Sequence, residues 1–226
     1  MTVASSTATH AASPRLSPAE AWAEMRAGNE RFVAGAPLHP HQDVASRRSL
    51  AKAQGPRAAL FGCADSRLAA EIIFDVGLGD LFVVRNAGQV IGDSIIGSLE
   101  YAVGVLHVPL IVVLGHDSCG AVQAAIESRL PDAAPLPHYI DGLVQKIVPA
   151  VQRVTGNREI TNAKQVDAGF VGREHLRDTV AELIASSEMI SDAVAAGTLA
   201  VVGANYRLLE GTAVPDVHVG NLEGAH

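Results

Sequence analysis

Two short segments, far apart in the chain, carry the residues best suited to metal chemistry. One is Cys63-Ala-Asp-Ser-Arg67 and the other is His116-Asp-Ser-Cys119-Gly120. Zn²⁺ binds thiolates and imidazoles readily, and three protein ligands leave a fourth position open, as in catalytic sites. A buried cysteine taken alone is more often a small core residue. Cys63, His116 and Cys119 together predict a zinc site.

Asp65 and Arg67 add an acid and a base beside that site. Asp65 could occupy the fourth metal position, which would leave no room for water. Arg67 lies two residues further on and can pair bidentately with the Asp65 carboxylate, which would keep Asp65 off the metal. The carboxylate would then accept a hydrogen bond from a zinc-bound hydroxide, which zinc generates near neutral pH. Such a pair alone could be an ordinary surface ion pair, but beside the ligands we expect a catalytic dyad.

Parallel strands would bring these segments together. Three short apolar runs, separated by helical segments, indicate buried parallel strands with right-handed crossovers. The predicted strands are Ala58–Gly62, Leu81–Arg85 and Leu110–Gly115, with helices at Leu68–Val76 and Ser94–His107 between them. Because ligands gather at the carboxyl ends of such strands, Cys63 and His116 should meet at one edge of the sheet.

The remaining pattern completes an α/β fold: a mostly parallel central sheet of about five strands flanked by helices, with an N-terminal helical arm. Residues 1–16 are expected to form a flexible tail, and residues 17–226 a single zinc-binding domain without internal repeats. The other predicted helices are Ser17–Gly35, Ser46–Gln54, Gly120–Arg129, Tyr139–Val154 and Arg173–Ala196, and the other strands are Thr198–Ala204 and Thr212–Val219.

The composition narrows the possible partners. The 226 residues carry a net charge of −7, which disfavours binding to nucleic acid or to an anionic membrane. No run reaches the roughly 18 apolar residues of a membrane span, and the first fourteen residues lack the features of a secretory signal. We therefore expect a cytoplasmic protein, in which two cysteines favour a metal over a disulfide.

The two metal-binding segments resemble the hallmarks of the β-class carbonic anhydrases. The similarity extends through Gly28–Phe32, Gly79–Gly88, Gly97–Val103 and Leu110–Val122, and so spans about residues 18 to 210. The resemblance implies Zn²⁺ on Cys63, His116 and Cys119, with Asp65 and Arg67 as the catalytic dyad. It also implies reversible hydration of CO₂ to bicarbonate and a homodimer or homotetramer.

Further residues match positions that hold substrate in that family. Gln54 matches a glutamine from near the subunit interface, and Gly120 matches a glycine whose backbone N–H approaches a substrate oxygen. Ala87 and Phe82 match the apolar lining of the pocket. Gln89 stands where the family usually has Asn or His, which affects the expected hydrogen bonding at the pocket edge.

Three other interpretations remain open from the residues. The same scaffold could hydrolyse a CO₂ analogue such as carbon disulfide. The zinc could instead be structural, with Asp65 permanently on the metal. A thiol-redox role is disfavoured because Cys63 and Cys119 are not in C-x-x-C spacing. The other histidines, His175 among them, show no ligand spacing and are interpreted as surface or packing residues, and no glycine fingerprint for a dinucleotide follows any strand.

Overall fold

The computed structural model describes residues 16–223, so the predicted tail lies almost entirely outside the described residues. The helices are α1 (Pro18–Val33), α2 (Val44–Ser49), α3 (Ala70–Ile73), α4 (Asp93–Gly104), α5 (Gly120–Glu127), α6 (His138–Gln145), α7 (Val148–Thr155), the 3₁₀ turn η1 (Ala163–Gln165), α8 (Ala168–Ser186) and α9 (Glu188–Ala195). The strands are β1 (Ala58–Cys63), β2 (Leu81–Asn86), β3 (Leu110–His116), β4 (Ala200–Arg207) and β5 (Thr212–Val219).

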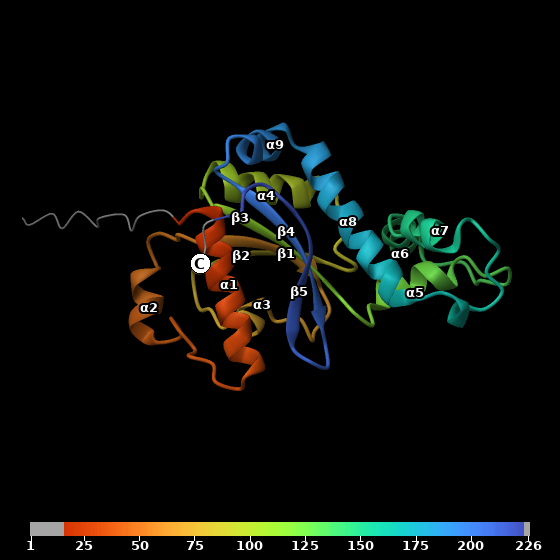
Figure 1. Cartoon of the computed structure of the whole chain (residues 1–226), viewed down its shortest axis with the longest axis horizontal. Helices are drawn as coiled ribbons and strands as arrows, with labels where there is room; N and C mark the ends of the chain where they lie inside the picture. The colour runs from red at the N-terminus through yellow and green to blue at the C-terminus, as the bar shows by residue number, and fades with distance from the viewer. Residues whose placement is uncertain (1–15, 224–226) are drawn as a thin grey trace, which may run out of the picture.

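The strands form one five-stranded sheet in the order β2-β1-β3-β4-β5. The first four are parallel, and β5 returns antiparallel to β4 at the edge. Every residue of β1 and β3 is buried, whereas β2 is only half-buried because it lies at the other edge. The predicted mostly parallel sheet of five strands is therefore confirmed, and Figure 1 shows helices on both of its faces.

Alternate residues of the central strands face two separate apolar layers. Leu60 and Val112 face the layer that contains α1, α3 and α5 to α7, and Phe61 and Val113 face the layer that contains α4, α8 and α9. Helices α5, α6 and α7 extend beyond one end of the sheet, and α8 runs from them across its face (Figure 1). Helix α8 therefore contacts both the helices beyond the end of the sheet and the strands at its centre.

Two helices that the pattern predicts as continuous are broken, so those predictions are wrong. Residues 139–154 form α6 and α7, because Pro149 has no N–H to donate to the Gln145 carbonyl and its ring would clash with that carbonyl. Residues 173–196 form α8 and α9, separated at Ser187, whose hydroxyl accepts a hydrogen bond from the N–H of Ile190 and so caps α9.

Two shorter helices also differ from their predicted bounds. The segment 68–76 contains only the single turn of α3, and Asp75 follows it with a positive φ of 43°. The segment 46–54 contributes to α2, which begins earlier because Asp43 caps it and which ends at Ser49. As a result Gln54 lies in an exposed loop before β1 rather than at the end of a helix.

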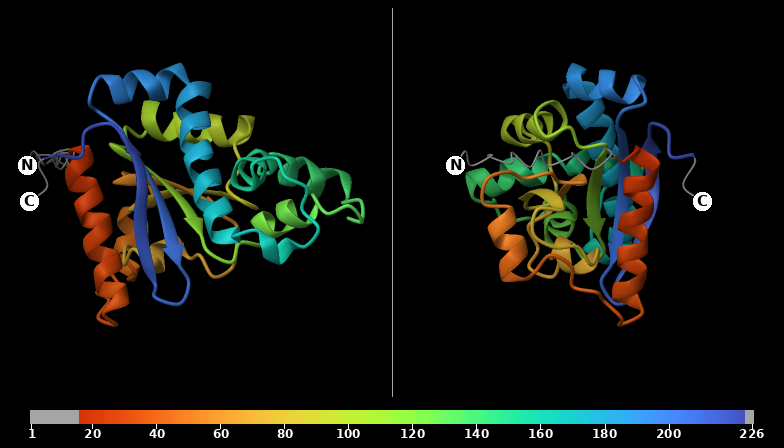
Figure 2. Two further views of the ribbon diagram at one scale, coloured as in Figure 1. Left: turned by 45° about the vertical axis from the view of Figure 1, so that its right-hand side comes forward. Right: turned by 90° about the vertical axis from the view of Figure 1, so that its left-hand side faces the viewer.

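The N-terminal arm is anchored to its own domain. Ser17 and Glu20 form a capping box at the start of α1, and Pro18 lies in its first turn. Asn29 donates to the Gly211 carbonyl at 2.8 Å and accepts from the Ala213 N–H at 2.9 Å, which holds α1 beside β5 (Figure 2).

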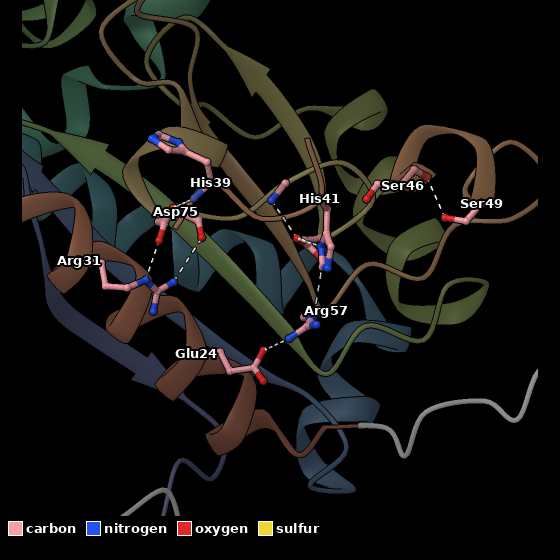
Figure 3. A network of polar contacts seen from close by, with 10 residues as sticks. Glu24, Arg31, His39, His41, Ser46, Ser49, Arg57 and Asp75 are labelled. Carbon is pink, nitrogen blue, oxygen red and sulfur yellow. Dashed lines mark hydrogen bonds and ion pairs between the residues drawn. The ribbon is translucent and has the colours of Figure 1, made fainter. Parts of the chain in front are cut away.

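One ion pair with a buried carboxylate and one exposed ion pair secure the segment that follows α1. The Asp75 carboxylate, with its side chain only 1% exposed, accepts from Arg31 Nε at 2.6 Å and from the N–H groups of Leu38 and His39 (Figure 3). Arg57 contacts Glu24 on α1 at 2.6 Å. These pairs fix the chain from residue 31 to residue 57 against the amino ends of the strands.

No helix within residues 16–223 combines the length and the apolar character that crossing a membrane requires.

Candidate metal centre

The register of the sheet brings the three predicted ligands together. β1 and β3 are parallel neighbours with Gly62 opposite Leu114, so Cys63 and His116 end adjacent strands at the same edge. Cys119 follows in the turn that starts α5. The two sulfurs and an imidazole nitrogen all lie within 4.8 Å of one another, and all three residues are buried. This is the spacing that a single metal ion requires, and it was predictable from the strand ends.

His116 presents a free nitrogen to this cluster. Its Nδ1–H donates to the carbonyl oxygen of Asp117 at 2.8 Å, because a carbonyl can only accept, and this leaves Nε2 with its lone pair. Nε2 is buried and has no hydrogen-bond partner among the described residues. A buried nitrogen of this kind is normally paired, and a ring fixed through its other nitrogen is typical of metal-bound histidines. The donor set therefore fits a Zn²⁺ ion.

The two cysteines form a closely coupled pair of sulfurs. A hydrogen bond between them lowers the pKa of Cys63 and raises the pKa of Cys119, since the second proton would have to leave beside an existing thiolate. The N–H groups of Val122 and Ala121, at the start of α5, act in the opposite direction on Cys119. A bound cation in place of the shared proton would favour the thiolate form of both sulfurs.

Asp65 and Arg67 form the bidentate pair that their spacing allows. Arg67 Nε donates to Asp65 Oδ1 at 2.9 Å and Nη2 donates to Oδ2 at 2.7 Å, while the backbone N–H of Arg67 also reaches Oδ1 at 2.9 Å. Nη2 additionally donates to the Ser118 carbonyl at 3.2 Å, which ties the pair to the turn that carries Cys119. The Arg67 side chain holds the pKa of Asp65 well below its ordinary range, so Asp65 is a carboxylate at neutral pH.

Comparison with known proteins matches this chain to one family. A family model described as carbonic anhydrase matches residues 58–213, a range that contains all five of these residues. Carbonic anhydrase 2 of Mycobacterium tuberculosis is 51% identical over 209 residues, which cover 92% of this chain and 98% of that protein. The chain belongs to the β-class carbonic anhydrases.

Further relatives agree with this assignment. The carbonic anhydrase of Mycolicibacterium smegmatis is 46% identical over 210 residues, covering 92% of this chain and 98% of that protein. Among solved structures, one of two β-carbonic anhydrases of Sordaria macrospora, described as tetrameric, superposes with a TM-score of 0.69 at 22% identity, covering 86% of this chain and 96% of that one. The fold is thus that of β-carbonic anhydrases. The family match and the identity to curated carbonic anhydrases over most of the chain make it an enzyme of the lyase class.

Backbone contacts that the sequence did not predict hold the Cys63–Arg67 turn in this carbonic anhydrase fold. Arg85 Nε donates to the Cys63 carbonyl at 3.0 Å, and its Nη2 donates to the Asp65 carbonyl at 2.6 Å. The N–H of Ala64 donates to the Asn86 carbonyl at 2.8 Å. The position of Arg85 at the end of a strand next to β1 was the one available signal.

The residues that the family resemblance assigns to substrate fall into two groups. Gly120 and Ala87 are exposed and lie at the same edge of the sheet as the cysteines, directly after Cys119 and directly after β2. Gln54 precedes β1, at the amino ends of the strands. The length of β1 alone separates these amino ends from the carboxyl ends by roughly 17 Å. Phe82 lies near the start of β2 and packs against Tyr101, with ring centroids 6.1 Å apart. The structure does not bring Gln54 or Phe82 to the metal cluster of their own chain.

Gln89 does not lie at an exposed pocket edge. It is 2% exposed, and its Oε1 has no hydrogen-bond partner within residues 16–223. Its backbone is left-handed, with a φ of 41°, and its side chain lies in the interior, so how this residue affects hydrogen bonding in the pocket stays a prediction.

Proposed function

We propose that this chain catalyses the reversible hydration of CO₂ to bicarbonate and a proton, with Zn²⁺ held by Cys63, His116 and Cys119. The observation that carries the proposal is the buried cluster of two sulfurs and an unpartnered Nε2, with the Asp65–Arg67 pair beside it. Two thiolates and a neutral imidazole balance the charge of a divalent zinc ion and leave one coordination position free. When bound, zinc supplies the Lewis acidity that lets a water ionise near neutral pH.

Asp65 orients the water that reacts. Because Arg67 keeps it ionised, the Asp65 carboxylate can accept a hydrogen bond but cannot donate one. A water that donates to Asp65 directs its proton toward the carboxylate and its oxygen lone pair toward the carbon of CO₂. Arg67, held by the Ser118 carbonyl, prevents Asp65 from turning onto the metal and filling the free position.

Gly120 and Ala87 form the substrate side of the same edge. A Cβ atom added at Gly120 would meet nothing within 4 Å, so open space lies beside its Cα. An oxygen of CO₂ can approach the backbone N–H of Gly120 closely, and the methyl group of Ala87 offers an apolar contact for the uncharged substrate.

A second copy of the chain completes this site. Gln54 and Phe82 cannot reach the cysteines of their own chain, whereas Gln54 of another chain can approach them across an interface. The β2 edge supports self-association, because Leu81, Phe82, Val83 and Val84 remain half-exposed on an open strand edge. The functional form is accordingly a homodimer or homotetramer. Its free thiols suit the reducing cytoplasm.

Stopped-flow measurement with a pH indicator tests the proposal. Zinc-loaded protein should hydrate CO₂ across pH 7 to 9, and protein stripped by a chelator should not. Carbon disulfide is assayed separately, as the substrate of the alternative activity. A rate at the uncatalysed level for zinc-loaded protein would overturn the proposal, as would an absence of zinc in gently purified protein by elemental analysis.

A further inference from the structure

Helix α8 places two polar side chains in an apolar layer, near the carboxyl ends of the strands where the candidate metal ligands lie. His175 is 3% exposed and Thr179 is 1% exposed, among Leu176, Val180 and other buried residues of the same stripe. The Nδ1 of His175 has no hydrogen-bond partner in the described part of the chain. An unpaired buried nitrogen destabilises the fold, so its presence here calls for a contribution beyond packing.

His175 donates to the loop after β2, and Thr179 shares its one hydroxyl proton between that loop and a carbonyl of its own helix. His175 Nε2 donates to the Gly88 carbonyl at 2.8 Å, and Thr179 Oγ1 lies 3.3 Å from the Gln89 carbonyl and 2.9 Å from that of His175. Burial lowers the pKa of His175, so its ring is neutral and carries its one proton on Nε2.

The loop that His175 and Thr179 contact has an unusual backbone. Gly88 and Gln89 are both left-handed, with φ angles of 79° and 41°. For a non-glycine residue such a conformation persists only when its surroundings hold it. On the other side, a Cβ at Gly88 would lie 2.8 Å from the Cβ of Ala121 and 3.0 Å from Ile147 Cδ1. The loop is therefore enclosed between α8 and the start of α5.

This enclosed loop contacts a metal ligand. The backbone N–H of Gly88 donates to Cys63 Sγ at 3.3 Å. Helix α8 also passes close to the second ligand strand, since a Cβ at Gly172 would lie 4.0 Å from the His116 carbonyl oxygen. One face of α8 thus lies against the supports of both ligand segments.

We infer that His175, assisted by Thr179, is a positioning residue for the metal centre, because it fixes the Gly88 backbone so that its N–H donates to Cys63 Sγ. The inference rests on the proposed function, since it assumes a metal on Cys63. A hydrogen bond to a thiolate sulfur withdraws electron density from it and fixes its orientation, and partners of this kind typically change metal affinity about 10- to 100-fold.

Substitutions at residue 175 separate the donor from the volume. His175→Leu removes the donor and fills the site, and His175→Gln keeps an N–H near the position of Nε2. Thr179→Val removes the second donor without changing shape. Leu183→Ala serves as the matched control, because it disturbs α8 at a buried position two turns further along, away from the loop.

The readouts are zinc affinity, by competition with a chromophoric chelator, and the sulfur-to-metal charge-transfer band of the Co²⁺-substituted protein. We expect His175→Leu to lower zinc affinity about 10- to 100-fold and to shift the band to longer wavelength, because the sulfur becomes a stronger donor. His175→Gln should remain close to wild type, and Thr179→Val should fall between the two.

A purely structural role predicts a different result. The inference is overturned if His175→Leu weakens zinc binding no more than Leu183→Ala does, if His175→Gln behaves like His175→Leu, or if the cobalt band does not move. Thermal unfolding of each metal-free variant identifies losses that follow stability alone. Failure of the wild-type protein to bind zinc or to hydrate CO₂ would overturn the proposed function instead.

Discussion

The carboxyl ends and the amino ends of the same strands are organised for different purposes. At the carboxyl ends, Cys63 accepts hydrogen bonds from Gly88 and Arg85, and His116 donates one to the Asp117 carbonyl, all within one chain. At the amino ends, the ion pair of the buried Asp75 carboxylate with Arg31 fastens the arm, yet Gln54 is exposed and touches none of the metal residues.

This difference separates what one chain does from what an assembly does. The three candidate metal ligands and the contacts that orient them all come from a single chain, on or next to β1, β2, β3 and α8. The amino ends of the strands stabilise their own chain, and in the proposed function they offer Gln54 to another. Substitutions at the two edges should therefore have effects that can be distinguished by experiment.

The largest effect is expected from removing a ligand at the carboxyl edge. Cys63→Ser replaces a thiolate with a hydroxyl that stays protonated at neutral pH, so zinc should be lost to a chelator and hydration should fall to the uncatalysed rate. Elemental analysis and stopped-flow measurement check both outcomes. Ser66→Ala, at an exposed position in the same turn, is the control and should behave as wild type. A zinc-retaining, active Cys63→Ser variant would contradict the assigned ligand set.

The next effect belongs to the amino edge and concerns stability. Asp75→Asn puts an amide against Arg31 and the N–H groups of Leu38 and His39, and breaking a buried pair of this kind costs about 3 kcal/mol of unfolding free energy. Urea unfolding measures the loss. Zinc affinity per folded chain should be unchanged, and a large drop in it would show that the two edges are not independent.

The pH dependence of stability follows from the same carboxylate. Burial alone would raise the pKa of Asp75, but the N–H of Leu38 and the Arg31 side chain outweigh it, so the pKa in the folded state is lowered. The unfolded chain then binds more protons than the folded chain as pH falls through about 3.9, the ordinary value for Asp, and the stabilisation is lost below it. Wild type should lose this stability in acid, and Asp75→Asn should lose less.

A third substitution acts at the carboxyl edge without removing a ligand. Arg67→Ala frees Asp65 to approach the metal position, so CO₂ hydration should fall about 100-fold, within the range for a positioned proton acceptor, while zinc stays bound. Arg67→Lys keeps the charge but loses the bidentate contact. Its rate of CO₂ hydration should lie between those of wild type and Arg67→Ala. Unchanged turnover in Arg67→Ala would show that the pair has no catalytic role.

Much of the site at the carboxyl ends of the strands was predictable, because apolar runs indicate the strands and the ligands follow directly after them. The apolar runs gave β1, β2 and β3, and a parallel sheet places Cys63 and His116 at one edge. The Asp65–Arg67 pair also followed from its spacing, since a two-residue separation lets the side chains meet.

The contacts from α8 could not be predicted in the same way. His175 and Gly88 are 87 residues apart, and no local pattern reports which loop a helix face will touch. A histidine on the apolar stripe of α8 was a signal, but packing was its ordinary interpretation. Likewise the breaks before Pro149 and at Ser187 depended on which local rule prevailed over a continuous apolar stripe.

The smallest effect tests whether the amino edge serves a second chain. Gln54→Ala should lower kcat/KM about tenfold, the value of one hydrogen bond to substrate, and leave zinc affinity unchanged. Stopped-flow assays of the zinc-loaded variant measure this, and Lys52→Ala, at a nearby exposed position, is the control. A wild-type rate for Gln54→Ala would remove this residue from the reaction.

Mixing two defective variants distinguishes the chains. Cys63→Ser lacks a metal site but retains Gln54, and Gln54→Ala retains the metal site. If each site combines Cys63 of one chain with Gln54 of another, refolding the two variants together creates hybrid dimers with one fully wild-type site, and activity should exceed the mean of the separate variants severalfold. If Gln54 served its own chain, no hybrid could contain an intact site, because each chain would carry its own defect. Additive activity in the mixture, with hybrid formation verified by native mass spectrometry, would therefore contradict the division between the two edges.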